Sequence, residues 1–309
     1  MKLVSFRGAG ARPRVGAVVR DRVIDLSDLV MSLRVPNDRA EELSARGIAV
    51  GGGGIRRLLN VGSHALEEIA EHVEALARYQ MLEHCWPVSK TALLAPVPRP
   101  GKIVAVGRNY ADHAKETGVA PFEQPRLIAK LPSSVVGPGA TVKRPPNVVK
   151  MDFEAELGVV IGEFAAHVSR ARALDYVVGY TALDDVSARE FQFDVTPPQT
   201  TFAKSMDGFC PMGPWLVTKD EIPNPQALEI VCHVNGELMQ RASTADMIFP
   251  VDALIEYISR YMTLEPGDVI ATGTPAGVGA FRDPPRWLKP GDRVRIEISR
   301  VGVLEHDIA

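Results

Sequence analysis

Runs of apolar, β-branched residues predict strands along most of the chain. Six such runs occur between residues 103 and 298. They span residues 103–106, 157–161, 177–182, 228–234, 269–272 and 293–298. Asn235 and Gly236 follow the fourth run and predict a hairpin turn. Strands and helices do not alternate regularly in this pattern, so we predict a β-rich body rather than a doubly wound parallel sheet.

The first 95 residues have a different pattern. Short apolar runs at 2–6, 15–19 and 22–26 predict three strands, and a glycine run at 51–54 predicts a flexible connection. Between residues 63 and 79, apolar residues recur at spacings of three and four, which predicts an amphipathic helix. This region therefore reads as a small α/β unit.

Prolines and a glycine between residues 96 and 101 separate the two patterns. A length of 309 residues also corresponds to about two domains at roughly 150 residues each. We predict a small N-terminal domain over 1–95 and a second domain over 96–309, with a further helix at 251–261. The expected fold class is α+β and rich in strands.

Charge and composition exclude several classes of protein. The net charge of −3 lacks the positive excess that nucleic acids or acidic membranes attract. No apolar run reaches about 18 residues, and the first residues lack the apolar segment of a signal peptide. The three cysteines have no CxxC spacing, which is typical of reduced thiols. We therefore predict a cytoplasmic protein with no nucleic-acid or membrane partner.

Two acidic segments predict a cation site. Glu154 and Glu156 lead into an apolar strand, where alternate residues share one face. Asp184 and Asp185 end a later strand, and adjacent side chains point in opposite directions, so only one aspartate should reach a given site. Carboxylates without a nearby Cys/His set favour a hard ion, Mg²⁺ first, with Mn²⁺ or Ca²⁺ as alternatives. The simpler interpretation is a solvated polar edge of a sheet.

A histidine follows the predicted strand at 103–106. His113 and Glu116 are three residues apart, so on a helical turn the carboxylate can orient the imidazole. Such a pair also occurs as ordinary surface polarity. The glycine-rich segment 273–279 lacks the lysine of a phosphate-binding loop, which argues against nucleotide binding.

Six ordered segments carry the most specific pattern. They are GRNYADHAKE (107–116), KLPSSVVGPG (130–139), DFEAELGVVIG (152–162), GYTALDDVSAREFQ (179–192), AKSMDGFCPMGPWLVT (203–218) and ATGTPAGVG (271–279). Together they closely resemble the fumarylacetoacetate hydrolase family in its single-catalytic-domain branch, over about residues 100–305. The resemblance implies a mixed β-sandwich roll, usually a homodimer.

The same resemblance implies a divalent metal, normally Mg²⁺, held by Glu154, Glu156 and Asp185. Many relatives have Asn where this chain has Asp184, which adds a negative charge that would alter metal affinity or lie at the surface. His113 and Glu116 are expected to activate water on a lid segment. Lys204 is expected to act in catalysis. The residues expected around the substrate are Arg108, Tyr110, Arg189, Gln192 and Thr274.

These residues support cleavage of a C–C bond in a 2,4-dioxo acid through a metal-bound enolate. His113 would take a proton from water, and Lys204 would stabilise negative charge or supply a proton, since burial and a cation lower the pKa of a lysine. The His113–Glu116 pair favours hydrolysis of acylpyruvate-type substrates. Oxaloacetate decarboxylation, isomerisation of a hydroxydienedioate and cleavage of a 2-keto-3-deoxy sugar acid stay open, as does a catalytically weak ligand-binding protein.

Overall fold

The computed structural model describes residues 1–8, 13–49, 54–78, 82 and 85–309, so most of the predicted glycine run lies outside the described residues. The predicted strands and helix of the N-terminal region are confirmed. Its strands are β1 (Lys2–Arg7), β2 (Pro13–Val19), β3 (Arg22–Asp25), β4 (Trp86–Pro87) and β5 (Ala92–Leu94). Its helices are α1 (Ser27–Ser32), α2 (Asn37–Ala45), α3 (Gly54–Val61) and α4 (His64–Arg78).

Strands dominate the rest of the chain, and all six predicted runs form strands. These strands are β6 (Ile103–Gly107), β7 (Arg126–Lys130), β8 (Val135–Val136), β9 (Thr141–Val142), β10 (Met151–Asp152), β11 (Ala155–Ile161), β12 (Val177–Asp184), β13 (Ser187–Ala188), β14 (Cys210–Thr218), β15 (Glu229–Val234), β16 (Glu237–Ser243), β17 (Val269–Ala271), β18 (Arg293–Ile298) and β19 (Gly302–Ile308). The α-helices are α5 (Ala111–Glu116), α6 (Arg189–Phe193), α7 (Thr200–Ala203) and α8 (Val251–Ser259). No described helix is long and apolar enough to cross a membrane.

A large mixed sheet crosses the whole molecule. Its strand order is β4-β3-β2-β1-β14-β12-β11-β17-β6-β7, with β5 beside β1 and β8 beside β14. β17 and β6 run parallel, whereas β11 and β12 run antiparallel. Every residue of β11 and β12 is buried, because both faces of these central strands are covered.

A second sheet, of order β16-β15-β18-β19-β9, packs against the first. The largest apolar core lies between them and joins residues such as Leu157, Tyr180 and Ile296. The predicted hairpin at Asn235 and Gly236 connects β15 to β16, and both residues have the positive φ that this turn needs. Two packed sheets with few helices confirm the α+β, β-rich fold class.

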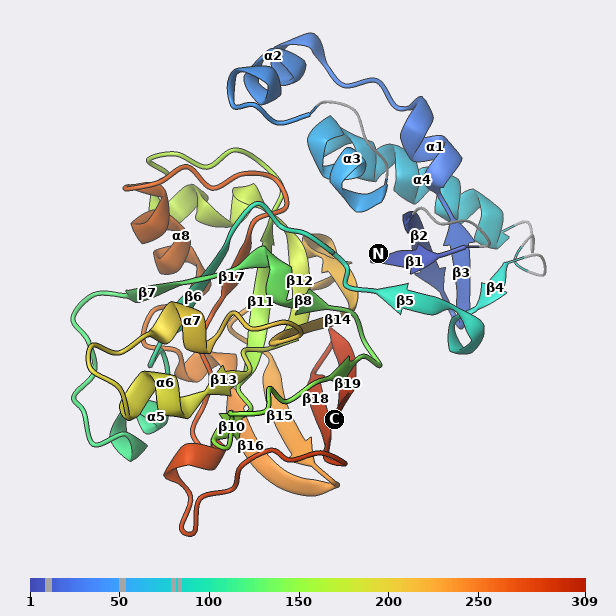
Figure 1. Cartoon of the computed structure of the whole chain (residues 1–309). Coiled ribbons are helices and arrows are strands. Elements are labelled where there is room, and N and C mark those ends of the chain that lie inside the picture. The colour runs from blue at the N-terminus through green and yellow to red at the C-terminus, as the bar shows by residue number, and fades with distance from the viewer. Residues whose placement is uncertain (9–12, 50–53, 79–81, 83–84) are drawn as a thin grey trace.

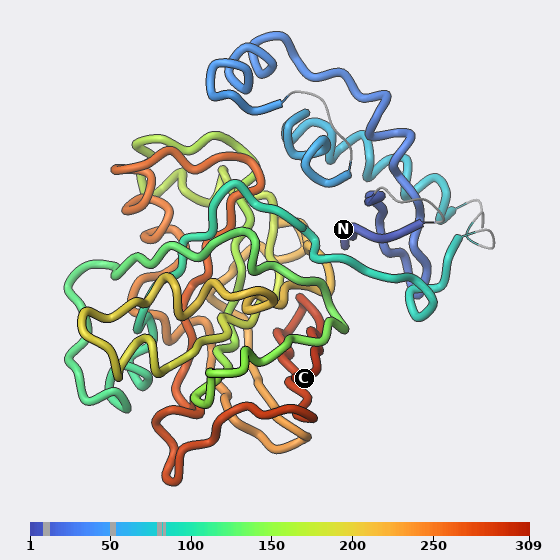
Figure 2. The backbone as a smooth tube through the Cα atoms, viewed as in Figure 1, coloured from blue at the N-terminus to red at the C-terminus, as the bar shows by residue number. Residues whose placement is uncertain are grey.

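The N-terminal elements gather on one side of this body (Figure 1). β1 nevertheless pairs with β14, with Lys2 opposite Val217 and Leu3 opposite Leu216. One apolar core also joins Leu3 and Ile69 to Ile103, across the predicted boundary. The boundary at residue 95 therefore stays a prediction. α5 and the chain leading to β7 lie on the side of the body away from the N-terminal elements (Figure 2).

Candidate active site

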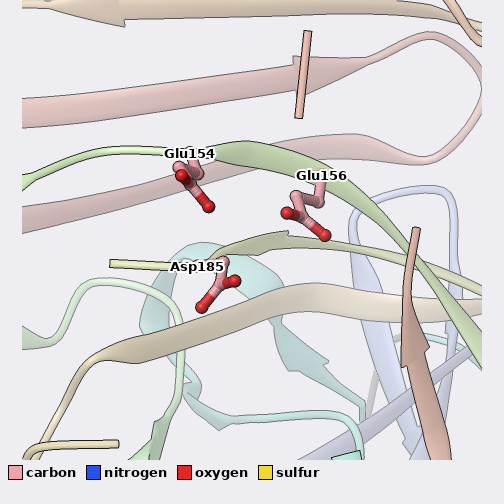
Figure 3. Close-up of side chains that lie close together, drawn as sticks. All are labelled: Glu154, Glu156 and Asp185. Carbon is pink, nitrogen blue, oxygen red and sulfur yellow. The ribbon is translucent and has the colours of Figure 1, made fainter. Parts of the chain in front are cut away.

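The predicted metal ligands meet at the ends of two neighbouring strands. β11 and β12 pair with Ala155 opposite Asp184, which leaves Glu154 and Asp185 side by side just beyond the paired ends. Glu156 lies two residues further on, on the same face as Glu154, and Figure 3 shows both side chains pointing toward Asp185. One oxygen from each of these three residues, the carboxylate triad, lies within 4.8 Å of the others, and all three residues are buried.

Three buried cations surround the carboxylate triad. Lys204 Nζ donates to Glu154 Oε2 over 2.6 Å and to Asp185 Oδ2 over 2.7 Å. Lys130 Nζ lies 2.8 Å from Asp185 Oδ1. Arg189 Nη2 lies 2.7 Å from Glu154 Oε1. Two of the three carboxylates are therefore neutralised by charged groups of the chain itself.

These contacts decide how the site is charged. Burial alone would raise the pKa of Glu154, but Lys204 and Arg189 outweigh it and hold that pKa well below the usual range. Burial would likewise lower the pKa of Lys204, but Asp185 and Glu154 outweigh it and raise that pKa. The two carboxylates therefore hold Lys204 as an ammonium group, and its role in catalysis stays a prediction.

Glu156 differs from the other two carboxylates. Within the described part of the chain it has no ion pair, and its Oε2 accepts a hydrogen bond from the Gly273 N–H over 2.8 Å. Burial, followed by the nearby charges of Asp185 and Glu154, raises the pKa of Glu156 well above its usual value. Gly273 has a φ of +98°, and a Cβ there would lie 2.7 Å from the Cβ of Asn109. Glycine is therefore required at this contact.

The donor set suits a hard divalent cation. The triad offers only carboxylate oxygens, which Mg²⁺, Mn²⁺ and Ca²⁺ accept, whereas zinc prefers nitrogen and sulfur donors. Asp152 adds a fourth buried carboxylate, which lies 2.9 Å from Arg189 Nε. Four carboxylates thus meet three cations, and Glu156 is the carboxylate without an ion pair among the described residues. A divalent cation in this place would make the local charge positive and attract an anionic substrate.

The predicted His–Glu pair forms a close contact. His113 is buried on α5, and its Nδ1 lies 2.6 Å from Glu116 Oε1. The Gly277 N–H donates to Glu116 Oε2 over 3.0 Å. The loop after β17 therefore supports both groups, since Gly273 binds Glu156 and Gly277 binds Glu116. These two backbone contacts account for Gly273 and Gly277, so the glycine-rich loop does not require a bound nucleotide as its explanation.

His113 and the triad border one cavity of about 230 Å³. The lining residues that the sequence singled out are Arg108, His113, Glu154, Glu156, Asp185, Arg189, Gln192, Lys204 and Thr274. Residues that the sequence did not single out include Thr117, Arg126, Ile128, Phe193 and Phe281. Among the residues that the structure describes, none before Ala105 lines this cavity.

The predicted substrate-binding residues differ from one another in their contacts and in whether they line the cavity. Gln192 Oε1 accepts from Arg189 Nη1 over 2.9 Å. Thr274 Oγ1 accepts from Gln240 Nε2 over 2.8 Å, and Gln240 had no signal in the sequence. Tyr110 is buried in the main core and is not among the residues that line the cavity. The roles of these residues toward a substrate stay predictions.

Asp184 points away from the triad. Its Oδ2 lies 2.8 Å from His306 Nε2, and its Oδ1 accepts from the Glu154 N–H over 2.8 Å. Both Asp184 and His306 are inaccessible to solvent. The prediction that only one of the two aspartates reaches the site is confirmed, and Asp184 is neither a surface residue nor a contact of the triad carboxylates.

Sequence reasoning missed the buried lysine beside Asp185. Lys130 ends β7, donates to the Lys204 carbonyl and is almost fully buried. Ser187, which accepts from Lys204 Nζ over 2.8 Å, was missed as well. A lysine that closes an apolar strand was the available signal for Lys130, whereas nothing in the sequence pointed to Ser187.

Comparison with known proteins settles the family. The family described as fumarylacetoacetate (FAA) hydrolase C-terminal matches residues 102–309. This chain belongs to the fumarylacetoacetate hydrolase family. It is 39% identical over 311 residues to the mitochondrial oxaloacetate tautomerase fahd2 of Xenopus laevis, which covers 100% of this chain and 90% of that relative.

Two solved structures extend the family comparison. Maleylpyruvate hydrolase from Sphingobium sp. SYK-6, in complex with manganese(II) and pyruvate, has a TM-score of 0.75 and 31% identity, and covers 100% of this chain and 99% of its own. The 2-hydroxyhepta-2,4-diene-1,7-dioate isomerase from Mycobacterium marinum has a TM-score of 0.64 and 40% identity, with coverage of 74% and 81%. These relatives are enzymes named for reactions of small organic acids.

Proposed function

We propose that this chain is a metal-dependent hydrolase that cleaves a C–C bond in a 2,4-dioxo acid. The observation that carries the proposal is the position of His113, which is held by Glu116 over 2.6 Å and borders the same cavity as the carboxylate triad. A base for water and a site for a cation thus share one space.

Glu154, Glu156 and Asp185 would hold Mg²⁺ or Mn²⁺, which when bound supplies a Lewis acid that polarises the 2-oxo group and stabilises an enolate. The lack of an ion pair at Glu156 among the described residues supports this assignment, because a cation would supply the missing partner. The manganese(II) and pyruvate in the Sphingobium enzyme support it as well.

His113 is the base in this proposal. With the proton on Nδ1, His113 donates a hydrogen bond to the Glu116 carboxylate, which leaves Nε2 with a free lone pair. Nε2 takes a proton from water, and the resulting hydroxide attacks the distal carbonyl carbon. The C–C bond then breaks, the acyl part leaves as a carboxylic acid, and the enolate that remains takes the proton held on Nε2 and becomes pyruvate.

Lys204 acts through its charge. Its three N–H groups donate to Glu154, Asp185 and Ser187 over 2.6–2.8 Å, so none is left for the substrate in this arrangement. The ammonium group pairs with two of the proposed metal ligands and contributes positive potential where negative charge develops.

Keto–enol conversion of oxaloacetate is a second candidate. The full-length similarity to the frog oxaloacetate tautomerase favours it. This reaction needs a proton transfer at C3 but no attacking water. The carboxylate triad and His113 would serve it as the cation site and the base. Decarboxylation and dienoate isomerisation would pass through an enolate of the same kind. The substrate screen described next also distinguishes them from hydrolysis.

The test is a substrate screen with Mg²⁺ and with EDTA. Acetylpyruvate, fumarylpyruvate and oxaloacetate are supplied, and pyruvate, CO₂ and the ultraviolet absorbance of the enol are measured. Pyruvate from the dioxo acids without CO₂ supports hydrolysis, whereas enol conversion alone supports the tautomerase. Full activity in EDTA contradicts the metal assignment, and binding without turnover indicates a catalytically weak protein.

The assembly and the location of the chain also remain proposals. We expect a homodimer and a cytoplasmic location, although the frog relative is named as mitochondrial. Sedimentation of the purified protein tests the first expectation, and fractionation of cells tests the second.

A further inference from the structure

Two arginines lie next to each other on one wall of the cavity. Arg126 begins β7 and pairs with Gly107, the last residue of β6, and Arg108 follows directly. All three residues line the same cavity as the carboxylate triad. Only Arg108 belongs to the segments that resemble the family, so Arg126 is a feature of this chain that the motifs do not explain.

The backbone and the packing hold both side chains at this wall. A Cβ on Gly107 would lie 3.5 Å from the Cδ of Arg126, so the stem of this arginine passes directly over Gly107. Arg108 has a φ of 56°, a left-handed conformation that is unfavourable for a residue with a side chain. The guanidinium carbons of Arg108 and Arg126 lie 5.4 and 5.9 Å from the centre of the Phe122 ring.

Neither arginine has an acidic partner among the residues that the structure describes. Arg189, which lines the same cavity, contacts both Asp152 and Glu154. Burial, followed by the charge of Arg126, lowers the pKa of Arg108. Two like charges held side by side repel each other, and an anion between them relieves that repulsion. The wall is therefore prepared for a negatively charged group of a ligand.

We propose that Arg108 and Arg126 bind the distal carboxylate of a dicarboxylic 2-oxo acid. The inference rests on the proposed function, because the triad and its cation would take the 2-oxo acid end of the same molecule. Guanidinium groups match a carboxylate with paired N–H donors, so the second carboxylate gains charged hydrogen bonds that a monocarboxylic substrate lacks. Arg126 thereby makes the enzyme selective for dicarboxylic substrates.

Binding of a matched pair of stable ligands tests this proposal. 2-Oxoglutarate and 2-oxopentanoate share five carbons and the 2-oxo acid end, and they differ in the distal carboxylate. In calorimetry with Mg²⁺, the wild-type protein should bind 2-oxoglutarate about tenfold or more tightly than 2-oxopentanoate. Arg126→Gln should remove most of this preference and leave the affinity for 2-oxopentanoate unchanged. Arg126→Lys, which keeps the charge, should retain part of it.

Arg260→Gln is the matched control, because Arg260 is exposed at the end of α8 and does not line the cavity. This variant should keep the full preference. A wild-type protein without preference for 2-oxoglutarate, or an Arg126→Gln variant that weakens both ligands equally, overturns the proposal. Turnover is measured separately, so a protein that prefers 2-oxoglutarate but converts no substrate contradicts the proposed function while it supports the carboxylate subsite.

Discussion

Two charged regions lie back to back at the end of β12, and they are built differently. Asp185 faces a cavity, where four carboxylates meet three cations and Glu156 has no ion pair among the described residues. Asp184 faces the core, where both of its oxygens have partners and no solvent reaches it. Charge that is sealed in a core must be paired, whereas charge beside a cavity can be left for a ligand to complete.

Glu156→Gln should have the largest effect on the cavity side. Loss of this ligand should weaken Mn²⁺ binding strongly and reduce turnover by about a thousandfold or more. Because Glu156 has no ion pair and repels its neighbours, the metal-free variant should be at least as stable as the wild type. Calorimetry with Mn²⁺ and urea unfolding in EDTA measure the two quantities. Retention of wild-type Mn²⁺ affinity would falsify the assignment of the triad.

His113→Ala should come next. Removal of the base should lower C–C hydrolysis by about a thousandfold, while the affinity for 2-oxo acids changes little because the triad is intact. Steady-state turnover and calorimetry separate the two effects. If the variant hydrolyses acylpyruvates at the full rate, His113 does not activate water.

Asp184→Ala should act mainly on stability, because Asp184 is fully buried and does not line the cavity. It leaves His306 and the Glu154 N–H without partners, at a cost of about 3 kcal/mol in the free energy of unfolding. Asp184→Asn keeps an oxygen for the Glu154 N–H and should cost only about 1 kcal/mol. Urea unfolding measures both variants. An equal loss in the two variants would show that the contact with His306, not the backbone contact, carries the effect.

Glu116→Gln should have the smallest effect. The amide keeps an oxygen acceptor toward His113 or Gly277 but loses the negative charge beside the imidazole. We expect a decrease in kcat of about tenfold with little change in KM. A variant that is as inactive as His113→Ala would mean that Glu116 does more than orient the imidazole.

Many strands and turns could be predicted from the sequence, because local patterns of apolar and turn residues specify them. The apolar runs at 157–161 and 177–182 predicted the strands β11 and β12, and Asn235-Gly236 predicted a hairpin. Pairing β1 with β14 was not predictable in this way. It joins residues more than 200 positions apart, and no local pattern specifies such a partner.

The candidate site also contains residues that local patterns placed and residues that they did not. Alternation along one strand and the spacing of a helical turn already placed Glu154 with Glu156 and His113 with Glu116. Distant segments contribute Lys130, Gln240 and His306. A single buried polar residue forms no repeating pattern in the sequence, so these three could not be recognised there.

The sequence by itself determined which side chains are available to the site, because motif order and strand alternation depend only on neighbours along the chain. Only the tertiary structure decided their charge states and partners. The raised pKa of Lys204, the turn of Asp184 toward His306 and the meeting of Arg108 with Arg126 all depend on segments brought together by folding. Electrostatic energy depends on distance in space and on burial, and neither quantity is encoded at any one position of the chain.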